Sequence, residues 1–289
     1  MKKNRAIVFT LTSDLAFAVA SVMLDIKRLS PALADEVVII HDGISKKDQE
    51  LLGSILPSRF IVYDFPIKEA STINTDVLSR FTKMIFAKFE CLKLLEDYKN
   101  ILLLDYDLVI QQDLSELFEP CESGLKMVSA GIKVRGQLHE ATNDYDMDAE
   151  GSGASQFVMQ DHMKDYMKMY HFCYESLIRY GKILYMPEQA IFDFMIQEFN
   201  IQNYPIDPHV YNSHPNDKEF ANNAKIIHSY GFPKFWNGLD NEQWNKNYQT
   251  WLKMGGSKYN QMTMKKVCKK LNNIVMRGLK KLQYSESNR

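Results

Sequence analysis

The sequence lacks any apolar run that is long enough to cross a membrane. A transmembrane helix needs about 18 or more consecutive apolar residues, and no stretch of the 289 residues approaches that length. Residues 15–26 (LAFAVASVMLDI) have the composition of a signal-peptide core, but Asp14 precedes them and Asp25 lies within them. Because they also follow a strand-like segment, we expect them to form the helix of a first β-α unit.

Cysteine is scarce, and the cysteines that are present are not closely spaced. The four are Cys91, Cys121, Cys173 and Cys268. Zinc sites and disulfide frameworks show close or regular cysteine pairs, which this spacing does not provide. We therefore expect reduced thiols and a cytoplasmic location, with neither a disulfide framework nor a zinc site.

The glycine-rich loops that cradle phosphates in many nucleotide enzymes are also missing. Neither Gly-x-x-x-x-Gly-Lys nor Gly-x-Gly-x-x-Gly occurs, which argues against a P-loop kinase and against a dehydrogenase. The net charge is only -1, and no basic patch with interleaved aromatic residues is apparent outside the C-terminus. We therefore expect no nucleic-acid partner.

In place of these features, the first hundred residues alternate regularly between strand and helix patterns. The predicted strands are residues 6–12, 36–42 and 59–65. The predicted helices run from a cap at Ser13 or Asp14 to about residue 27, from Ser45 to residue 55, and from residue 76 to residue 95. This order predicts an α/β fold with a Rossmann-like, mostly parallel central sheet flanked by helices.

The next strand delivers two carboxylates. Residues 101–110 (ILLLDYDLVI) form an apolar run that carries Asp105 and Asp107. Residues i and i+2 of an extended chain project from the same face, so both carboxylates can bind one cation. At the carboxyl end of a central strand, such a pair suits a divalent metal that neutralises a diphosphate. Salt bridges from the two acids to nearby lysines are the alternative.

The middle of the chain is less regular. Residues 131–155 are polar, contain several glycines and show little periodicity. An active-site loop and a plain surface insertion are both compatible with that composition. A strand at residues 155–160 and helices at about 162–180 and 188–199 are predicted to follow.

A second candidate site lies in residues 226–236 (IIHSYGFPKFW), where His228, Gly231 and Lys234 follow an apolar pair at three-residue spacing. Imidazole is a plausible third ligand beside two carboxylates for Mn²⁺. Glycine permits close approach of the backbone to a phosphate, and lysine supplies a point charge for it. A structural histidine satisfied by its neighbours is the alternative.

Residues 258–281 are rich in lysine and arginine and contain no acid, and their apolar residues recur at helical spacing. The pattern predicts a basic amphipathic helix that binds an anionic membrane surface, and docking on its own domain is the alternative. We therefore divide the chain into a catalytic domain, residues 1–255, and a basic helical tail, residues 256–289.

These pieces together resemble glycosyltransferase family 8, the retaining GT-A enzymes that include glycogenin and bacterial lipopolysaccharide galactosyltransferases. The resemblance covers most of residues 5–236. The matching segments are TLTSDLAF after the first strand, FAKFECLKLLEDYKNILLLDYDLVI around the Asp-x-Asp pair, MPEQAIFDF at residues 186–194, and HSYGFPKFW at residues 228–236.

The resemblance implies a role for each matching position. The implied ligands of Mn²⁺, or of Mg²⁺ in its place, are Asp105, Asp107 and His228. The implied contacts to the nucleotide-sugar are Thr12, Asp14, Phe17, Lys88, Asp105, Tyr106, Gly231 and Lys234. The implied catalytic positions beside the transferred sugar are Glu188 and Gln189.

Some positions depart from the family pattern. Leu15 and Ala16 replace polar residues near the base, and Ala190 replaces an acid beside the sugar. Phe235 replaces a proline, and residues 153–155 match the family's Asn-Ala-Gly turn only loosely. The set implied for metal and diphosphate is intact, whereas the set implied for sugar selection is altered.

The expected activity is metal-dependent transfer of a hexose, glucose or galactose, from a UDP-sugar with retention of configuration. The expected acceptor is a bacterial surface glycan or a lipid-linked oligosaccharide, reached from the inner face of the plasma membrane. One alternative is a sugar nucleotidyltransferase, although the glycine- and basic-rich loop of that class is absent after the first strand. The other is a degenerate family member that binds UDP-sugar without turnover.

Overall fold

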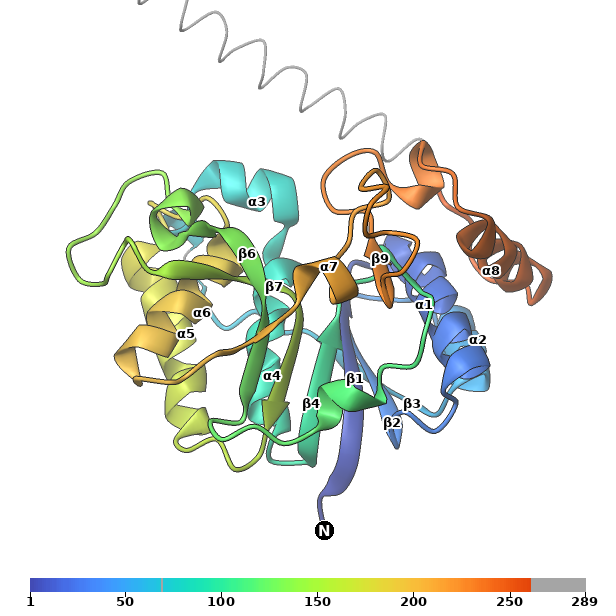
Figure 1. Ribbon diagram of the computed structural model, residues 1–289, viewed down its shortest axis with the longest axis horizontal. Coiled ribbons are helices and arrows are strands. Elements are labelled where there is room, and N and C mark those ends of the chain that lie inside the picture. Colours follow the sequence, from blue (N-terminus) through green and yellow to red (C-terminus); the bar gives the residue numbers. More distant parts are fainter. Residues whose placement is uncertain (69, 261–289) are drawn as a thin grey trace, which may run out of the picture.

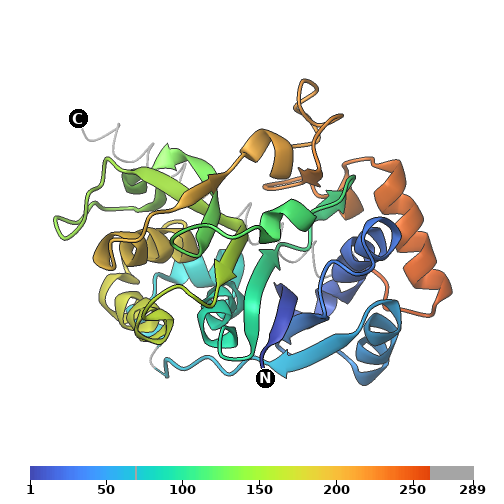
Figure 2. The same ribbon diagram turned by 60° about the horizontal axis from the view of Figure 1, so that its bottom comes forward.

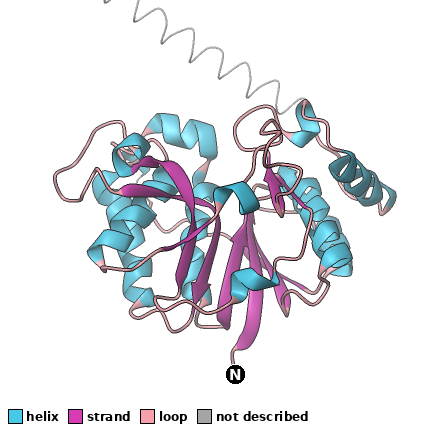
Figure 3. Ribbon diagram, viewed as in Figure 1, coloured by secondary structure: helices cyan, strands magenta, loops and turns pink. Residues whose placement is uncertain are grey.

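A seven-stranded sheet runs through the middle of the computed structural model, and helices lie on both faces of it (Figure 1 and Figure 3). The structure describes residues 1–68 and 70–260. In spatial order the strands are β3 (Ser58–Val62), β2 (Glu36–His41), β1 (Lys3–Leu11), β4 (Tyr98–Leu104), β7 (Glu150–Gln160), β6 (Leu125–Lys133) and β8 (Tyr204–Ile206). Only β7 runs antiparallel to its neighbours, so the predicted mostly parallel α/β sheet is confirmed.

The two faces of the sheet form two separate hydrophobic cores. Successive residues of a strand point to opposite faces, so Ile7 and Phe9 of β1 lie in one core while Ala6 and Val8 lie in the other. The first core packs under α1 (Ala16–Leu29), α2 (Lys46–Ile55) and α8 (Glu242–Lys253), and the second under α4 (Glu90–Leu94), α5 (Tyr166–Tyr180) and α6 (Pro187–Glu198). Figure 2 shows α8 lying alongside α1.

The strand order reverses between β1 and β4. The chain builds β1, β2 and β3 outward in one direction and then returns to place β4 on the other side of β1. A reversal of this kind opens a crevice at the carboxyl ends of the two central strands, where α/β proteins bind ligands. A small second sheet of β5 (Leu108–Ile110) and β9 (Ile226–His228) lies at this end, and Figure 1 shows β9 beside α7 (Pro208–Tyr211).

The single long helix predicted for residues 76–95 is wrong. The structure contains α3 (Thr75–Phe81), a 3₁₀ segment at Lys83–Phe89 and then α4. Thr82 adopts a left-handed φ of 60° and its hydroxyl accepts a hydrogen bond from the Met84 backbone. One face of a regular helix cannot bury five neighbouring residues, whereas here Met84, Phe86, Ala87, Lys88 and Phe89 are all buried.

The polar stretch predicted as a loop at residues 131–155 is also partly wrong. Strand β6 extends to Lys133 and β7 begins at Glu150 rather than at residue 155. Their pairing shifts register between Met127 and Val128 and again between Ser129 and Lys133. These bulges break the alternation of apolar and polar residues, which is why the sequence pattern conceals the strands.

The other helices occur close to their predicted positions, and Ser45 caps α2 as expected, accepting a hydrogen bond from the Asp48 backbone. Residues 256–260 still pack on the preceding part of the chain, because Trp251 donates to the Ser257 carbonyl and the Ser257 N–H donates to Asp48. The rest of the predicted basic tail, residues 261–289, lies outside the described residues. In the part of the chain that the structure describes, we find no helix both long enough and apolar enough to span a membrane.

Candidate active site

The Asp-x-Asp pair occupies the short turn between β4 and β5, and backbone hydrogen bonds fix both residues. The Asp105 N–H donates to the Ser155 carbonyl at 2.9 Å, and the Asp107 carbonyl accepts from the Ser229 N–H at 3.0 Å. The β5–β9 register places Leu108 opposite His228. Two loops that are distant in sequence therefore meet at the carboxyl end of β4.

Asp25 of α1 holds β5 in place. Its carboxyl is fully buried and accepts a hydrogen bond from the Ile110 N–H at 3.1 Å, while Arg28 pairs with it at 2.8 Å. Arg28 also donates to the Ile110 carbonyl. Helix α1 thus anchors both backbone groups of the last residue in the strand that follows Asp107.

Asp105, Asp107 and His228 converge as the sequence predicts. One ligand atom from each lies within 4.8 Å of the others. His228 Nε2 is 3.1 Å from Asp107 and 4.0 Å from Asp105. Two carboxylates and an imidazole form a donor set that a divalent cation can share, so these residues fit the implied metal.

Asn212, which the sequence patterns did not single out, orients the imidazole. His228 Nδ1 donates to Asn212 Oδ1 at 2.6 Å. With Nδ1 protonated, Nε2 is directed at the two carboxylates, which is the usual arrangement behind a histidine ligand. Asn212 follows α7 in a segment that resembles no motif, so only the folded structure connects it to His228.

Lys234 pairs directly with Asp107, and its ammonium also donates to the Ser229 carbonyl at 2.8 Å. Burial alone would raise the pKa of Asp107, but His228 and Lys234 hold it well below its usual range. Asp107 is therefore ionised at neutral pH. We call the group formed by Asp105, Asp107, His228 and Lys234 the strand side of the site.

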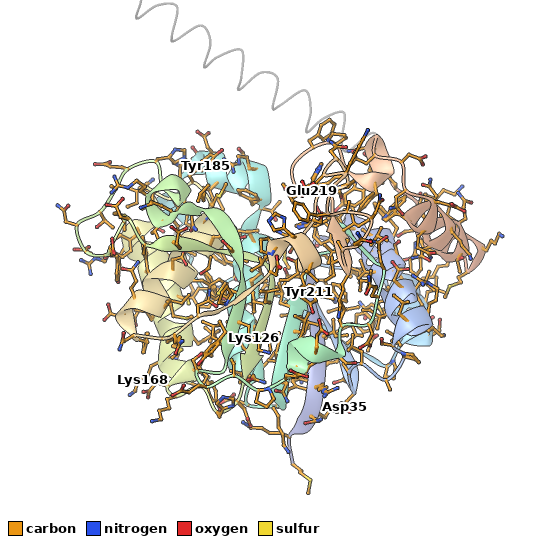
Figure 4. The ribbon with its side chains drawn as sticks, viewed as in Figure 1. Asp35, Lys126, Lys168, Tyr185, Tyr211 and Glu219 are labelled. Atoms are coloured by element: carbon orange, nitrogen blue, oxygen red, sulfur yellow. The ribbon has the colours of Figure 1, made fainter. Side chains whose placement is uncertain are left out.

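Opposite lies the helix side, which we define as Gly153, Glu188, Gln189 and Asp193 around the first half of α6. Gln189 is half-buried, and a Cβ built on Gly153 would lie 3.7 Å from its Nε2. Burial raises the pKa of Glu188, and Lys88 offsets only part of that effect. In Figure 4, Tyr185, shortly before α6, lies at the same upper end of the molecule as β9 and its loop.

Lys88 joins the two sides. It is 4% exposed, and its ammonium lies 2.9 Å from Asp105, 3.6 Å from Glu188 and 2.9 Å from the Ala154 carbonyl. Burial alone would lower the pKa of Lys88, but Asp105 and Glu188 raise it above its ordinary value. Asp105 therefore makes the salt bridge that was the alternative to metal binding, in addition to facing the metal-type cluster.

The residues expected to contact the nucleoside lie after β1. The Thr12 hydroxyl donates to Asp14 at 2.6 Å. Burial together with the charges of Asp107, Asp105 and Asp14 raises the pKa of Tyr106, which places Asp14 in the electrostatic range of the Asp-x-Asp turn. Gly231 has a φ of 72°, a backbone conformation that favours glycine.

Phe17 does not face the crevice. Its ring is fully buried and contacts the rings of Trp236, Tyr248 and Tyr259 at centroid distances of 5.5 to 5.6 Å. In this packing it has no exposed face on which a base could stack. Ala16 and Ala190 are also fully buried, so these two departures from the family pattern lie in the core.

Comparisons with known proteins agree with the arrangement. The model of the family described as glycosyl transferase family 8 matches residues 6–240. A search of curated proteins finds no match. Among solved structures, the galactosyltransferase LgtC, in complex with donor and acceptor sugar analogs, is similar at a TM-score of 0.64 and 14% identity, covering 86% of this chain and 99% of that one.

Two further structures share the fold. The apo bifunctional glycosyltransferase WbbM aligns at a TM-score of 0.66 and 15% identity, covering 88% of this chain and 51% of that one, so this chain spans about half the length of WbbM. GlyE of Streptococcus pneumoniae aligns at 0.56 and 12% identity, covering 88% of this chain and 64% of that one. With its GT-A-type sheet and its converging Asp-Asp-His group, the chain belongs to glycosyl transferase family 8 and is a glycosyltransferase.

Proposed function

We propose that the protein transfers a hexose from a UDP-sugar to a glycan acceptor, in a reaction that depends on a divalent cation, Mn²⁺ or Mg²⁺. The observation that carries this proposal is the convergence of Asp105, Asp107 and His228 within 4.8 Å at the carboxyl end of β4, with Lys234 beside them. A cation bound there would offset the charge of the departing UDP.

Each group of residues in the site has a separate role in this proposal. Asp105, Asp107 and His228 would hold the cation, and Lys234, now paired with Asp107, would supply a positive charge to the diphosphate. Lys88 is enclosed by Asp105 and Glu188, so it acts by holding these two side chains in place. In this proposal Thr12, Asp14 and Tyr106 would contact the nucleoside, and Glu188 and Gln189 would contact the transferred sugar.

We propose that configuration is retained by attack on the same face of the sugar. The acceptor oxygen bonds to the anomeric carbon while the bond from that carbon to UDP breaks, and the hydroxyl proton passes to a phosphate oxygen. An enzyme nucleophile is less suitable, since Gln189 offers only a weakly nucleophilic amide and the Glu188 carboxyl faces Lys88 at 3.6 Å.

Donor turnover by two alanine variants tests this proposal. We expect Asp105→Ala and His228→Ala each to abolish cation-dependent turnover of UDP-glucose, UDP-galactose and their N-acetyl forms. Asp97→Ala is the matched control, because Asp97 precedes β4 at its opposite end and should leave turnover unchanged. Near-normal activity of both site variants would refute the metal assignment. Cation-dependent UDP binding without turnover of any donor would support a degenerate family member.

We further propose that the acceptor is a bacterial surface glycan, or its lipid-linked precursor, and that residues 258–281 bring the enzyme to the cytoplasmic face of an anionic membrane. The basic, acid-free composition of these residues supports the proposal. Deleting residues 261–289 preserves Tyr259, which packs on Phe17. The deletion should abolish sedimentation with phosphatidylglycerol vesicles, whereas unchanged sedimentation would contradict the membrane proposal.

A further inference from the structure

A buried carboxyl lies one helical turn beyond Gln189 on α6. Asp193 is 3% exposed, and residues i and i+4 of a helix share a face, so Asp193 lies beneath Gln189. In the described part of the chain it has no ion-pair partner, and burial raises its pKa to about 7. Burying a carboxyl without a nearby cation is costly. The hydrogen bonds of Asp193 must therefore offset that cost.

Those hydrogen bonds converge on one residue of β7. The Ser152 N–H donates to both Asp193 oxygens at 3.0 Å. Gln137 Nε2 donates to Asp193 at 2.8 Å and to the Ser152 carbonyl at 3.3 Å. Two buried side chains therefore hold both backbone groups of Ser152.

The held segment lies in the irregular part of the pairing between β7 and β6. Its pairing with β6 shifts register next to Ser152 and Gly153. Gly153 faces Gln189, and the Ala154 carbonyl accepts the hydrogen bond from Lys88. Any movement of Ser152 would therefore be transmitted to Gly153 on the helix side and to Lys88.

Gln137 also fixes the start of α6. Its backbone carbonyl accepts from the N–H groups of Tyr185 and Met186, each at 3.0 Å, and α6 begins at Pro187. Gln137 is fully buried, and a Cβ on Gly151 would lie 2.4 Å from its Nε2. Gln137 thus connects the start of α6, Asp193 and the backbone of β7 through hydrogen bonds, and it is tightly packed against Gly151.

We propose that Asp193 and Gln137 are positioning residues that set the spacing between Gly153 and Gln189 and so orient the transferred sugar. The inference rests on the proposed function. Neither side chain needs to touch the donor, because both act through the backbone of β7 and the first turns of α6.

The test separates the sugar from the nucleotide. Misplacing a reacting group by a small distance can reduce the rate about 100-fold, so we expect Asp193→Ala to lower kcat for sugar transfer by about 10- to 100-fold. The Kd for UDP with Mn²⁺ should change much less than kcat, because Asp107 and His228 are held through β5 and β9 rather than through Ser152.

Asp193→Asn should restore transfer to within a few-fold of the wild type. Its Oδ1 can accept from the Ser152 N–H. Placed where Asp193 Oδ2 lies, the same oxygen can also accept from Gln137 Nε2. Gln137→Ala should resemble Asp193→Ala, since it removes the other half of the pair.

Cys173→Ala is the control for destabilisation. The Cys173 thiol of α5 packs on Met195 of α6 at 3.8 Å, but it makes no hydrogen bond to Asp193, Gln137 or Ser152. The proposal is overturned if Asp193→Ala transfers sugar as well as Cys173→Ala, if UDP affinity falls as much as kcat, or if Asn fails to rescue. If the wild type binds the donor without turnover, the measurement that replaces kcat is the ratio of the Kd for UDP to the Kd for the UDP-sugar. The same variants should then lose any preference for the UDP-sugar over UDP. Absence of UDP binding in the wild type would overturn the proposed function itself.

Discussion

The strand side and the helix side of the site are built from different interactions. The strand side is a compact set of opposite charges, in which Asp107 faces both His228 and Lys234. The helix side consists of a glycine, the Gln189 amide and two carboxyls, of which Glu188 faces Lys88 and Asp193 is held by N–H donors alone. Opposite charges recognise a metal and a diphosphate whatever sugar is attached, whereas directional hydrogen bonds depend on the shape of the sugar.

This difference teaches where specificity lies in the molecule. The positions implied for metal and diphosphate match the family pattern in full, while Ala190 and residues 153–155 depart from it on the helix side. Under the proposed function, the strand side would hold the leaving group, and the helix side is where the choice of hexose is expected to be made.

Removal of the lysine that joins the two sides should have the largest effect. Lys88→Met leaves Asp105 and Glu188 facing each other without a cation, and breaking a buried ion pair costs about 3–5 kcal/mol. Urea denaturation should report a loss of that order. Lys93→Met, an exposed lysine of the adjacent α4, is the control, and a loss no larger than the control's would mean that the two sides are not joined through Lys88.

Truncation of Asn212, which orients His228, should have the next largest effect. That effect should be confined to the strand side. Removing a partner that orients a metal ligand typically lowers affinity by about 10- to 100-fold, so Asn212→Ala should weaken Mn²⁺ binding by that factor. Electron paramagnetic resonance of free Mn²⁺ measures it. Asn212→Asp keeps an acceptor for Nδ1 and should retain affinity, as should Asn216→Ala in the same loop. Equal binding by Asn212→Ala would remove this residue from the site.

The pH dependence of stability should reveal the helix side. The pKa of Asp193 is raised to about 7, so the folded state binds this proton more tightly than the unfolded chain does. The resulting stabilisation is complete below the unfolded-state pKa and is lost as the pH rises through about 7. Asp193→Asn lacks this loss and should therefore gain Tm relative to the wild type between pH 5 and 8, by about 2–4 °C per kcal/mol. A difference in Tm that is independent of pH would contradict the raised pKa.

Local patterns were sufficient to predict much of this molecule. Short apolar runs located β1 and β2, and the two-residue spacing of Asp105 and Asp107 predicted side chains that face one cation. The break at Thr82 could not be predicted, because local patterns do not show that the segment after it buries Lys88 against Asp105 and Glu188.

The helix side was still less accessible to sequence reasoning. Its hydrogen bonds join residues that are 41 and 56 positions apart. Bulges in the pairing of β7 also interrupt the apolar pattern that would identify the strand. Asn212 reaches His228 across 16 positions with no intervening pattern. Periodicity identifies which face of an element is buried, but it does not identify which polar side chains meet there.

The most direct test of the central claim is an anomalous difference map, recorded at the manganese absorption edge, from crystals grown with Mn²⁺ and UDP. We predict one strong peak bounded by Asp105, Asp107 and His228, with the diphosphate beside it and the Lys234 ammonium moved from Asp107 to a phosphate oxygen. A map with UDP bound but no manganese peak among these three residues, or with Lys234 still on Asp107, would contradict the account.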